Sequence, residues 1–296
     1  MTSINILAPA VLITGVSSGI GEAMANFLLT RGYRVFGSIR KLADAQRLID
    51  SWADSFVPVE MDVTDHASVE AAVASVQTAL AGSNLTALIN NAGVSTAGPL
   101  LEQPWEEIQS TFEVNVFGLL KVTRSFAVLL GRGSEMPGRI VNISSVSGMI
   151  TVPFLATYAA SKHAVEALTQ GLRRELLSSG IHVAAIEPGF IRTPLFEKSK
   201  KALNTESYTE SGYSNSWAVF NETLRGMEKR AKSPDVVCKA VLHAISAKRP
   251  KSRYPLDALW WVGKYLPDRM FDQLILNSLG LSAWLKGSDV KPLSER

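Results

Sequence analysis

The sequence predicts an α/β fold in which helices cover both faces of one parallel sheet. Two hydrophobic periods alternate along the 296 residues, with short apolar runs of strand length between longer amphipathic runs of helical period. Such alternation is typical of β-α-β units with right-handed crossovers, which build a doubly wound sheet. Because 46% of the residues are hydrophobic, the chain can fill one large core. We therefore expect residues 1–296 to form a single domain.

The elements follow from these periods in chain order. Strands are expected at residues 10–14, 34–38, 56–60, 87–90, 139–143 and 182–187. Helices are expected at residues 22–29, 67–80, 105–130 and 157–178. Ser233, Pro234 and Asp235 predict the start of a further helix, because serine is a good cap and proline suits the first helical position. The basic run at 248–253 is expected to be a solvated loop.

A glycine-rich turn joins the first expected strand to the first expected helix. The run reads Thr14-Gly15-Val16-Ser17-Ser18-Gly19-Ile20-Gly21. Glycine permits positive φ angles and close approach of the backbone to a bulky anion, and the N–H groups of the following helix favour phosphate. The spacing departs from the G-x-G-x-x-G dinucleotide fingerprint, so the run taken alone fits an ordinary turn equally well.

Tyr158 and Lys162 stand four residues apart in an expected helix, so both side chains lie on one face about one turn apart. A cation beside a phenol favours the phenolate. We therefore expect Lys162 to lower the pKa of Tyr158 from about 10 toward the range useful to a general acid or base. This spacing also occurs by chance, so the pair gains weight only from motifs elsewhere in the chain.

Several motifs in one order resemble those of a known family. They are Thr14-Gly-x-x-x-Gly-Ile-Gly21, Asn90-Asn91-Ala92-Gly93, Asn115, Ser145, Tyr158-x-x-x-Lys162 and Pro188-Gly189. Their order and separations resemble the short-chain dehydrogenases/reductases over residues 9–193. The resemblance implies a Rossmann-type sheet, a nicotinamide dinucleotide, and hydride transfer between the nicotinamide and a carbinol or carbonyl carbon.

By the same resemblance, Asn115, Ser145, Tyr158 and Lys162 form the catalytic set. Tyr158 would exchange a proton with the substrate oxygen, Ser145 would hydrogen-bond that oxygen, and Lys162 would also contact the nicotinamide ribose. Asn115 would interrupt its helix so that its carbonyl binds a water beside the lysine. We prefer Ser145 to Ser144 because it lies thirteen residues before Tyr158, the usual separation in the family.

The end of the second strand predicts the cofactor. NAD-binding relatives carry an acidic residue there, whereas this chain has Ser38 followed by Arg40 and Lys41. Two cations beside an uncharged residue suit a 2′-phosphate, so we expect NADP(H), although both cations would also suit a solvated loop. The resemblance assigns further cofactor contacts to Ser17, Ser18, Gly19, Ile20, Asp62, Val63, Asn91, Ala92, Gly93, Pro188, Gly189 and Thr193. For Asp62 and Val63 the alternative is a turn that caps the next helix.

Beyond Thr193 the sequence matches the family only in general layout. Residues 195–232 mix polar and aromatic side chains and fit a substrate lid, although the aromatic residues would also fit packing against one another. Residues 256–285 form an apolar C-terminal helical extension that charged residues interrupt, so it cannot span a bilayer as one helix. For this extension we rank a lid above an oligomer contact, and an oligomer contact above interfacial membrane contact.

Composition excludes several function classes. A net charge of +3 gives no indication of a nucleic-acid surface, and the four histidines are too dispersed for a metal site. The single cysteine, Cys238, is expected to be a buried apolar residue on a helix. Without a recognisable targeting segment, we expect a cytoplasmic protein.

These observations together predict an NADP(H)-dependent ketone reductase or alcohol dehydrogenase. The run Arg173-Arg174-Glu175-Leu176 resembles the retinol and hydroxysteroid branch, so the expected substrate is a hydrophobic secondary alcohol or ketone of steroid, retinoid or aromatic type. The family implies a homodimer or homotetramer. A non-catalytic NADP(H) sensor or scaffold, and a nucleotide-sugar epimerase of the same fold, remain as alternatives.

Overall fold

One seven-stranded sheet runs through the computed structural model, which describes residues 8–192, 208 and 210–288. The strands are β1 Ala10–Ile13, β2 Arg34–Ile39, β3 Phe56–Glu60, β4 Ala87–Asn90, β5 Arg139–Ile143, β6 His182–Glu187 and β7 Arg253–Pro255. Their order is β3-β2-β1-β4-β5-β6-β7, and every neighbouring pair is parallel. The predicted doubly wound, Rossmann-type sheet is confirmed.

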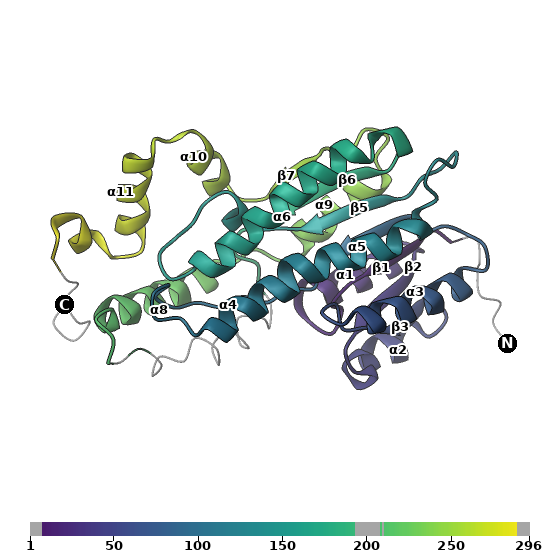
Figure 1. Ribbon diagram of the computed structural model, residues 1–296, viewed down its shortest axis with the longest axis horizontal. Coiled ribbons are helices and arrows are strands. Elements are labelled where there is room, and N and C mark those ends of the chain that lie inside the picture. The colour runs from purple at the N-terminus through teal and green to yellow at the C-terminus, as the bar shows by residue number, and fades with distance from the viewer. Residues whose placement is uncertain (1–7, 193–207, 209, 289–296) are drawn as a thin grey trace.

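Helices cover both faces of this sheet (Figure 1). The longer helices are α1 Gly19–Leu29, α2 Gln46–Trp52, α3 His66–Leu80, α4 Trp105–Phe112, α5 Leu119–Phe126, α6 Ala156–Glu175, α8 Ser214–Glu228, α9 Asp235–Ser246, α10 Leu259–Tyr265 and α11 Asp268–Ser278. Alternate side chains of β1 enter two different cores, because neighbouring residues of a strand point to opposite faces. Val11 and Ile13 pack with α1, α2 and α9, whereas Leu12 packs with α3 and α5.

The strand order reverses at the centre of the sheet, between β1 and β4. Strands β2 and β3 lie on one side of β1 in the sheet, whereas β4 and the later strands lie on its other side. In open parallel sheets, ligands bind at the carboxyl ends of the strands where the order reverses. Here that point lies between β1 and β4, where the glycine turn after Ile13 meets the segment that follows Asn90.

The expected helix at residues 105–130 is interrupted. Between α4 and α5 the chain forms a π-helical segment, Glu113–Gly118, and a 3₁₀ turn, Ala127–Leu130, follows α5. The irregularity that the family resemblance implied at Asn115 is therefore present. Cys238 is buried on α9, as predicted, and α9 begins at Asp235 directly after Ser233 and Pro234.

The basic run before residue 254 differs from the prediction. Arg253 begins β7, which pairs with the end of β6, and its partly buried guanidinium pairs with the buried carboxylate of Glu187. This strand is hard to predict from its residues, because it has only three of them and ends in proline. Lys248 and Lys251, which precede the strand, are both exposed to solvent, as predicted.

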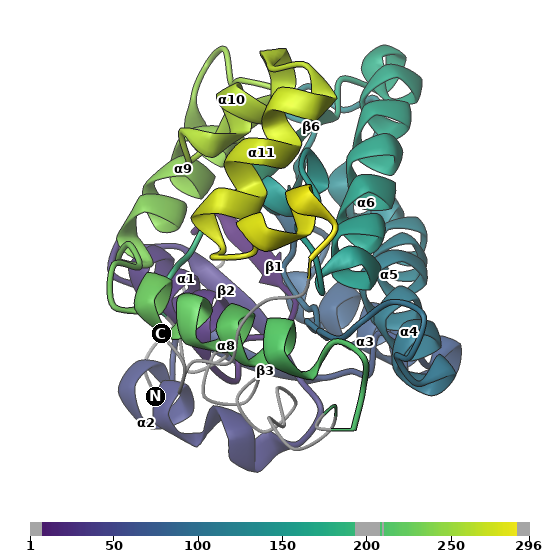
Figure 2. The same cartoon turned by 90° about the vertical axis from the view of Figure 1, so that its left-hand side faces the viewer.

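Helices α8, α10 and α11 gather at one end of the molecule (Figure 2). Buried aromatic side chains hold this end together: Phe154 contacts Trp217 and Phe220 at ring-centroid distances of 5.4 and 5.1 Å. Trp284 closes the cluster and donates a hydrogen bond to Ser216 on α8 at 3.0 Å. Much of the aromatic content of the expected lid is thus used in its own packing. Among the described residues, no helix is long and apolar enough to cross a membrane.

Candidate active site

The glycine turn and the segment after β4 are bonded into one unit. The Thr14 hydroxyl accepts hydrogen bonds from the N–H groups of Asn91 and Ala92, both at 2.9 Å. The Asn91 amide donates to the carbonyls of Thr14 at 2.9 Å and Gly15 at 3.1 Å. Asn91 and Ala92 therefore fix the turn, which is a structural task in addition to the predicted cofactor contact.

Three glycines give the turn its shape. Gly15 and Gly19 have φ angles of +73° and +66°, a region that other residues rarely adopt. A Cβ on Gly21 would lie 2.1 Å from the Gly15 carbonyl oxygen and 2.6 Å from the Asn91 amide nitrogen. Ser18 precedes the first turn of α1 without capping it through its side chain. The N–H groups at the start of α1 therefore suit a phosphate, with Ser17 and Ile20 partly exposed beside them.

At the ends of β2 and β3, some of the predicted cofactor residues are buried and hold the turn, and others are exposed. Ser38 is buried, and its hydroxyl accepts the Gly15 N–H at 3.1 Å, so this side chain supports the turn. Arg40 and Lys41 are exposed beside it. Hydrogen bonds from Thr64 hold the pKa of the Asp62 carboxyl below its usual value, and Arg40 lowers it further. The predicted turn at Asp62 exists, and contact of these residues with adenosine stays a prediction.

Val63 is buried and packs against the π-helical segment. A Cβ on Gly118 would lie 2.8 Å from a methyl group of Val63, so glycine lets these two parts approach closely. Val63 therefore packs the segment that carries Asn115 against the end of β3.

Asn115 connects the π-helical segment with two other parts of the candidate site. Its amide donates to the Val94 carbonyl at 2.9 Å and to the Ser161 hydroxyl at 3.0 Å, and its oxygen accepts the Val94 N–H at 2.8 Å. Gly93 fits beside it, since a Cβ there would lie 3.1 Å from the Asn115 oxygen and 3.7 Å from the Lys162 ammonium nitrogen. The loop after β4, Asn115 and Lys162 are thus brought together.

Ser145 lies beside Tyr158, close enough to lower the pKa of its phenol. Ser145 follows β5, and its hydroxyl also accepts the Ser147 N–H at 3.1 Å. The preceding Ser144 faces a different group, because a Cβ on Gly148 would lie 2.9 Å from both the Ser144 hydroxyl and the Glu166 side chain. This arrangement supports the choice of Ser145 over Ser144 as the partner of Tyr158.

The pKa of Tyr158 differs from the sequence-based expectation. Burial raises the pKa of its phenol, and the neighbouring Ser145 hydroxyl opposes this only in part. Lys162 lies 5.8 Å from the centre of the Tyr158 ring, and its ammonium donates to the Ile143 carbonyl at 3.0 Å. The lysine is thus held over the ring and beside β5, which explains why the expected lowering of the phenol pKa is absent.

The pKa of Lys162 is also shifted. Burial lowers the pKa of its amine to about 8, and the carboxylate of Glu166, one helical turn later, opposes the shift. At neutral pH the amine is therefore charged but gives up its proton more readily than an exposed lysine. Such a group suits a proton relay.

Pro188 and Gly189 follow β6 and lie beside Ser145. The Pro188 carbonyl accepts the Val146 N–H at 2.8 Å and the Ser145 hydroxyl at 3.5 Å. The structure thus brings together the four segments that carry Gly15, Gly93, Ser145 and Pro188. Thr193, the last predicted contact, lies outside the described residues.

The model of the short chain dehydrogenase family matches residues 9–204 of this sequence. The chain belongs to this family. This short-chain dehydrogenase is therefore an oxidoreductase acting on CH–OH or C=O groups, as predicted from the motifs. It is 37% identical over 274 residues to an NADPH-dependent 3-dehydrocapnine reductase of Ornithobacterium rhinotracheale, covering 90% of this chain and 96% of that protein.

Two further similar proteins widen the comparison. The chain is 34% identical over 284 residues to 17-beta-hydroxysteroid dehydrogenase type 6 of Rattus norvegicus, with 90% of this chain and 87% of that protein covered. A solved structure of an actinorhodin polyketide ketoreductase with NADPH has a TM-score of 0.72 and 29% identity, covering 85% of this chain and 96% of that one. The family resemblance noted in the sequence is confirmed.

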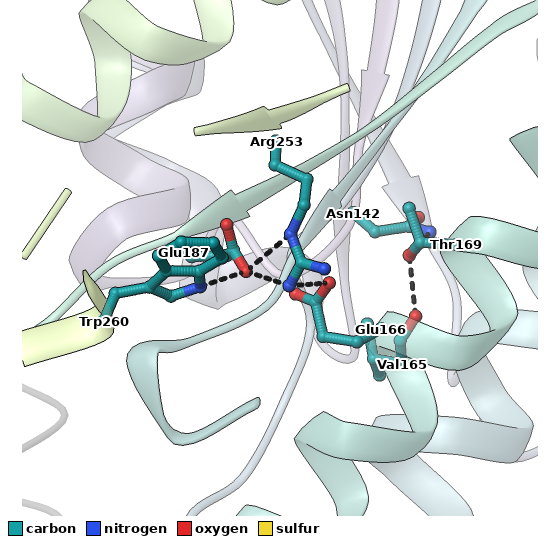
Figure 3. Close-up of polar contacts among 7 residues, drawn as sticks. All are labelled: Asn142, Val165, Glu166, Thr169, Glu187, Arg253 and Trp260. Carbon is teal, nitrogen blue, oxygen red and sulfur yellow. Dashed lines mark hydrogen bonds and ion pairs between the residues drawn. The ribbon is translucent and has the colours of Figure 1, made fainter. Parts of the chain in front are cut away.

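Sequence reasoning missed a buried charged group next to this site. Glu166, Glu187 and Arg253 meet behind Ser144 and Pro188, and Trp260 of α10 contacts them (Figure 3). One signal was available: Glu187 closes a strand that is otherwise buried, and a buried carboxylate needs a cation or hydrogen-bond donors. Arg253 supplies both from a strand that the sequence did not reveal.

Proposed function

We propose that this short-chain dehydrogenase interconverts hydrophobic secondary alcohols and ketones with NADP(H) as the hydride carrier. The observation that carries the proposal is the grouping of Ser145, Tyr158 and Lys162, at the end of the sheet where the strand order reverses. A phenol, a hydroxyl and a perturbed lysine in contact can deliver and withdraw one proton at a substrate oxygen.

The residues at this end of the sheet fit a dinucleotide phosphate. Gly21 lets the start of α1 approach the Gly15 carbonyl closely, and Arg40 and Lys41 offer exposed cations at the end of β2. Arg40 can bind a 2′-phosphate through two parallel N–H groups. The similar 3-dehydrocapnine reductase is described as NADPH-dependent, which agrees with this assignment.

The chain's own residues have distinct tasks in the proposed reaction. When bound, NADP(H) supplies or accepts the hydride. Because burial raises the pKa of Tyr158, its hydroxyl is protonated at neutral pH and can donate to the oxygen of a ketone. Ser145 donates a hydrogen bond to the same oxygen and stabilises the negative charge that develops there. Lys162 then helps to return a proton to Tyr158.

The end that carries α8, α10 and α11 favours an apolar substrate. Partly buried apolar side chains surround the aromatic cluster there, among them Val152, Leu155, Phe190, Tyr213 and Leu259. A hydroxysteroid dehydrogenase is among the similar proteins, which supports a bulky ring-containing alcohol or ketone. The lid function of residues 195–232, the role of the C-terminal extension, the oligomeric state and the cytoplasmic location stay predictions.

The test is a fluorescence titration of the purified protein with NADPH and NADH, followed by nicotinamide absorbance with steroid, retinoid and aromatic ketones. We expect tighter binding of NADPH and its oxidation by at least one ketone. The variant Arg40→Ala should lose about tenfold in NADPH affinity and little in NADH affinity, because only NADPH carries the phosphate. Arg174→Ala, an exposed arginine on α6, is the matched control.

Other outcomes would change the proposal. A preference for NADH would contradict the assignment of Arg40. Binding of NADPH without turnover of any ketone would favour a non-catalytic sensor. Release of an epimerised nucleotide sugar, with no net change in nicotinamide absorbance, would favour the epimerase alternative.

A further inference from the structure

A buried charge cluster lies directly behind the candidate active site. Glu187, at the end of β6, is fully buried, and one of its carboxylate oxygens accepts the Arg253 Nε–H at 3.2 Å. Arg253 also contacts the carboxylate of Glu166 at 2.8 Å. Figure 3 shows the guanidinium between the two carboxylates, which come from α6 and β6. One cation therefore ties the helix of Lys162 to the strand that leads into Pro188.

Trp260 of α10 completes the cluster. Its indole N–H donates to the same Glu187 oxygen at 2.7 Å, and Arg253 lies 5.2 Å from the centre of its ring. Only 2% of this large side chain is exposed. A buried hydrogen bond to a carboxylate is strong, so α10 is held at a fixed position relative to β6.

Trp260 also packs beneath the loop that carries Ser145. Its ring lies in one apolar cluster with Val146, the residue after Ser145, and with Ile150. The N–H of Val146 donates to the Pro188 carbonyl at 2.8 Å. The indole ring therefore packs against the Ser145 loop while its N–H donates a hydrogen bond to Glu187.

The start of α10 touches the other loop of the site. A Cβ on Gly189 would lie 2.4 Å from a carboxylate oxygen of Asp257, so glycine lets the Asp257 side chain pack directly against this loop. The other Asp257 oxygen accepts the Leu259 N–H at 3.0 Å and fixes the first turn of α10. The Leu256 N–H also donates to the Glu187 carbonyl at 3.0 Å.

We infer that Glu187 and Trp260 are positioning residues for the proposed reaction: their hydrogen bond fastens α10 beneath the Ser145 and Pro188–Gly189 loops and holds these loops in the geometry that binds NADP(H). The C-terminal extension is thereby a part of the catalytic architecture. This inference rests on the proposed function, since it assigns the same two loops to the cofactor and the substrate oxygen. A small displacement of such loops carries a large penalty in binding and rate.

The test compares two tryptophan variants of the full-length protein. Trp260→Phe keeps an aromatic ring in the apolar cluster and removes the N–H that Glu187 accepts. We expect the NADPH dissociation constant, measured by fluorescence titration, to rise about tenfold, with a similar rise in the KM for NADPH. Trp261→Phe makes the same chemical change at the next residue, which is 50% exposed, and should bind NADPH like the wild type.

A merely structural role would give a different pattern. If Trp260→Phe lowers the midpoint of thermal unfolding but binds NADPH as tightly as Trp261→Phe does, the inference is overturned. Glu187→Gln provides a second variant, because glutamine keeps an oxygen for the indole N–H but loses the charge that pairs with Arg253. It should weaken NADPH binding less than Glu187→Ala, and equal binding by both would also overturn the inference.

The same measurements separate this inference from the proposed function. Wild-type protein that binds no NADPH would contradict the proposed function and the inference together. Wild-type protein that binds NADPH and reduces a ketone, with both tryptophan variants unchanged, would leave the function in place and remove the role of α10.

Discussion

Two opposing effects act on the proton of Tyr158. The sequence predicts that Lys162 favours the phenolate, whereas burial in the structure favours the neutral phenol and raises its pKa. Burial also weakens the lysine as a cation, because it lowers the pKa of the amine to about 8. A tyrosine that keeps its proton is better prepared for ketone reduction, which needs a proton donor, than for alcohol oxidation.

Replacement of Tyr158 by phenylalanine removes this proton donor and little else. We expect Tyr158→Phe to lower kcat by about 10²- to 10⁴-fold, the usual contribution of a general acid. The NADPH dissociation constant should stay within about twofold of wild type, since no phosphate contact is lost. Tyr265→Phe is the matched control, because that tyrosine is 70% exposed on α10. Undiminished turnover in Tyr158→Phe would remove the mechanism.

The glycine turn permits a second test at a single residue. The added methyl of Gly21→Ala would overlap the Gly15 carbonyl, at 2.1 Å, so the turn must open. We expect the free energy of unfolding to fall by about 1–3 kcal/mol and NADPH affinity to fall with it. Gly226→Ala on α8 adds the same methyl where nothing lies within 4 Å, and should be neutral or stabilise by up to about 1 kcal/mol. Equal behaviour of the two variants in urea unfolding would contradict the close fit.

The π-helical segment shows how one polar side chain organises an element. Asparagine is a poor residue for a helix interior, and the structure explains its presence by three hydrogen bonds that Asn115 makes with Val94 and Ser161. Its side chain thereby fastens the loop after β4 to α6. The water-mediated relay through its carbonyl stays a prediction.

Asn115→Ala should therefore damage both stability and turnover. It would leave the partly buried N–H and carbonyl of Val94 without their side-chain partner and open a gap at a buried position, so we expect the free energy of unfolding to fall by about 2 kcal/mol. Asn277→Ala, at an exposed position of α11, should change it by less than about 0.5 kcal/mol. Urea unfolding at one pH compares the pair. Equal stability of the two variants would show that the three hydrogen bonds contribute nothing net.

Elements with a strong local pattern were predictable, and elements that depend on distant partners were not. Strands β3, β4, β5 and β6 have the predicted bounds, because each is built around a short apolar stretch of strand length. Strand β7 has three residues and exists because it completes the edge of the sheet beside β6. The candidate site has the same limit, because Arg253 and Trp260 reach it through contacts with residues such as Glu187, which lies far away in the sequence.

The charge balance of the whole molecule includes one unusual carboxyl group. Burial and the neighbouring Glu187 raise the pKa of Glu166 from 4.5 to about 7, although Arg253 opposes the shift. The folded protein therefore binds more protons than the unfolded chain between these two values. By linkage, this group stabilises the fold at low pH, and its contribution is lost as the pH rises through about 7.

Glu166→Gln removes this titration while keeping the shape of the side chain. Between pH 5 and pH 8 the wild type should lose about 2 kcal/mol of stability relative to the variant, because only the wild type must ionise a buried carboxyl. Urea unfolding at both pH values measures the difference. Glu175→Gln, at an exposed position of the same helix, should run parallel to the wild type. A parallel course for Glu166→Gln as well would place its pKa near that of an ordinary glutamate.

The parallel order of the sheet also bears on how long the molecule survives in a cell. The segments that meet around the proposed dinucleotide site come from residues 14–21, 90–93, 145–162 and 188–189, and they meet only when β1, β4, β5 and β6 are all in place. An incomplete or partly unfolded chain has no such site, so the ligand would bind the finished fold alone. A plentiful supply of NADP(H) would then protect the protein from proteases, and a shortage of the dinucleotide would shorten the lifetime of the protein. Abundance as well as activity would follow the cellular concentration of NADP(H).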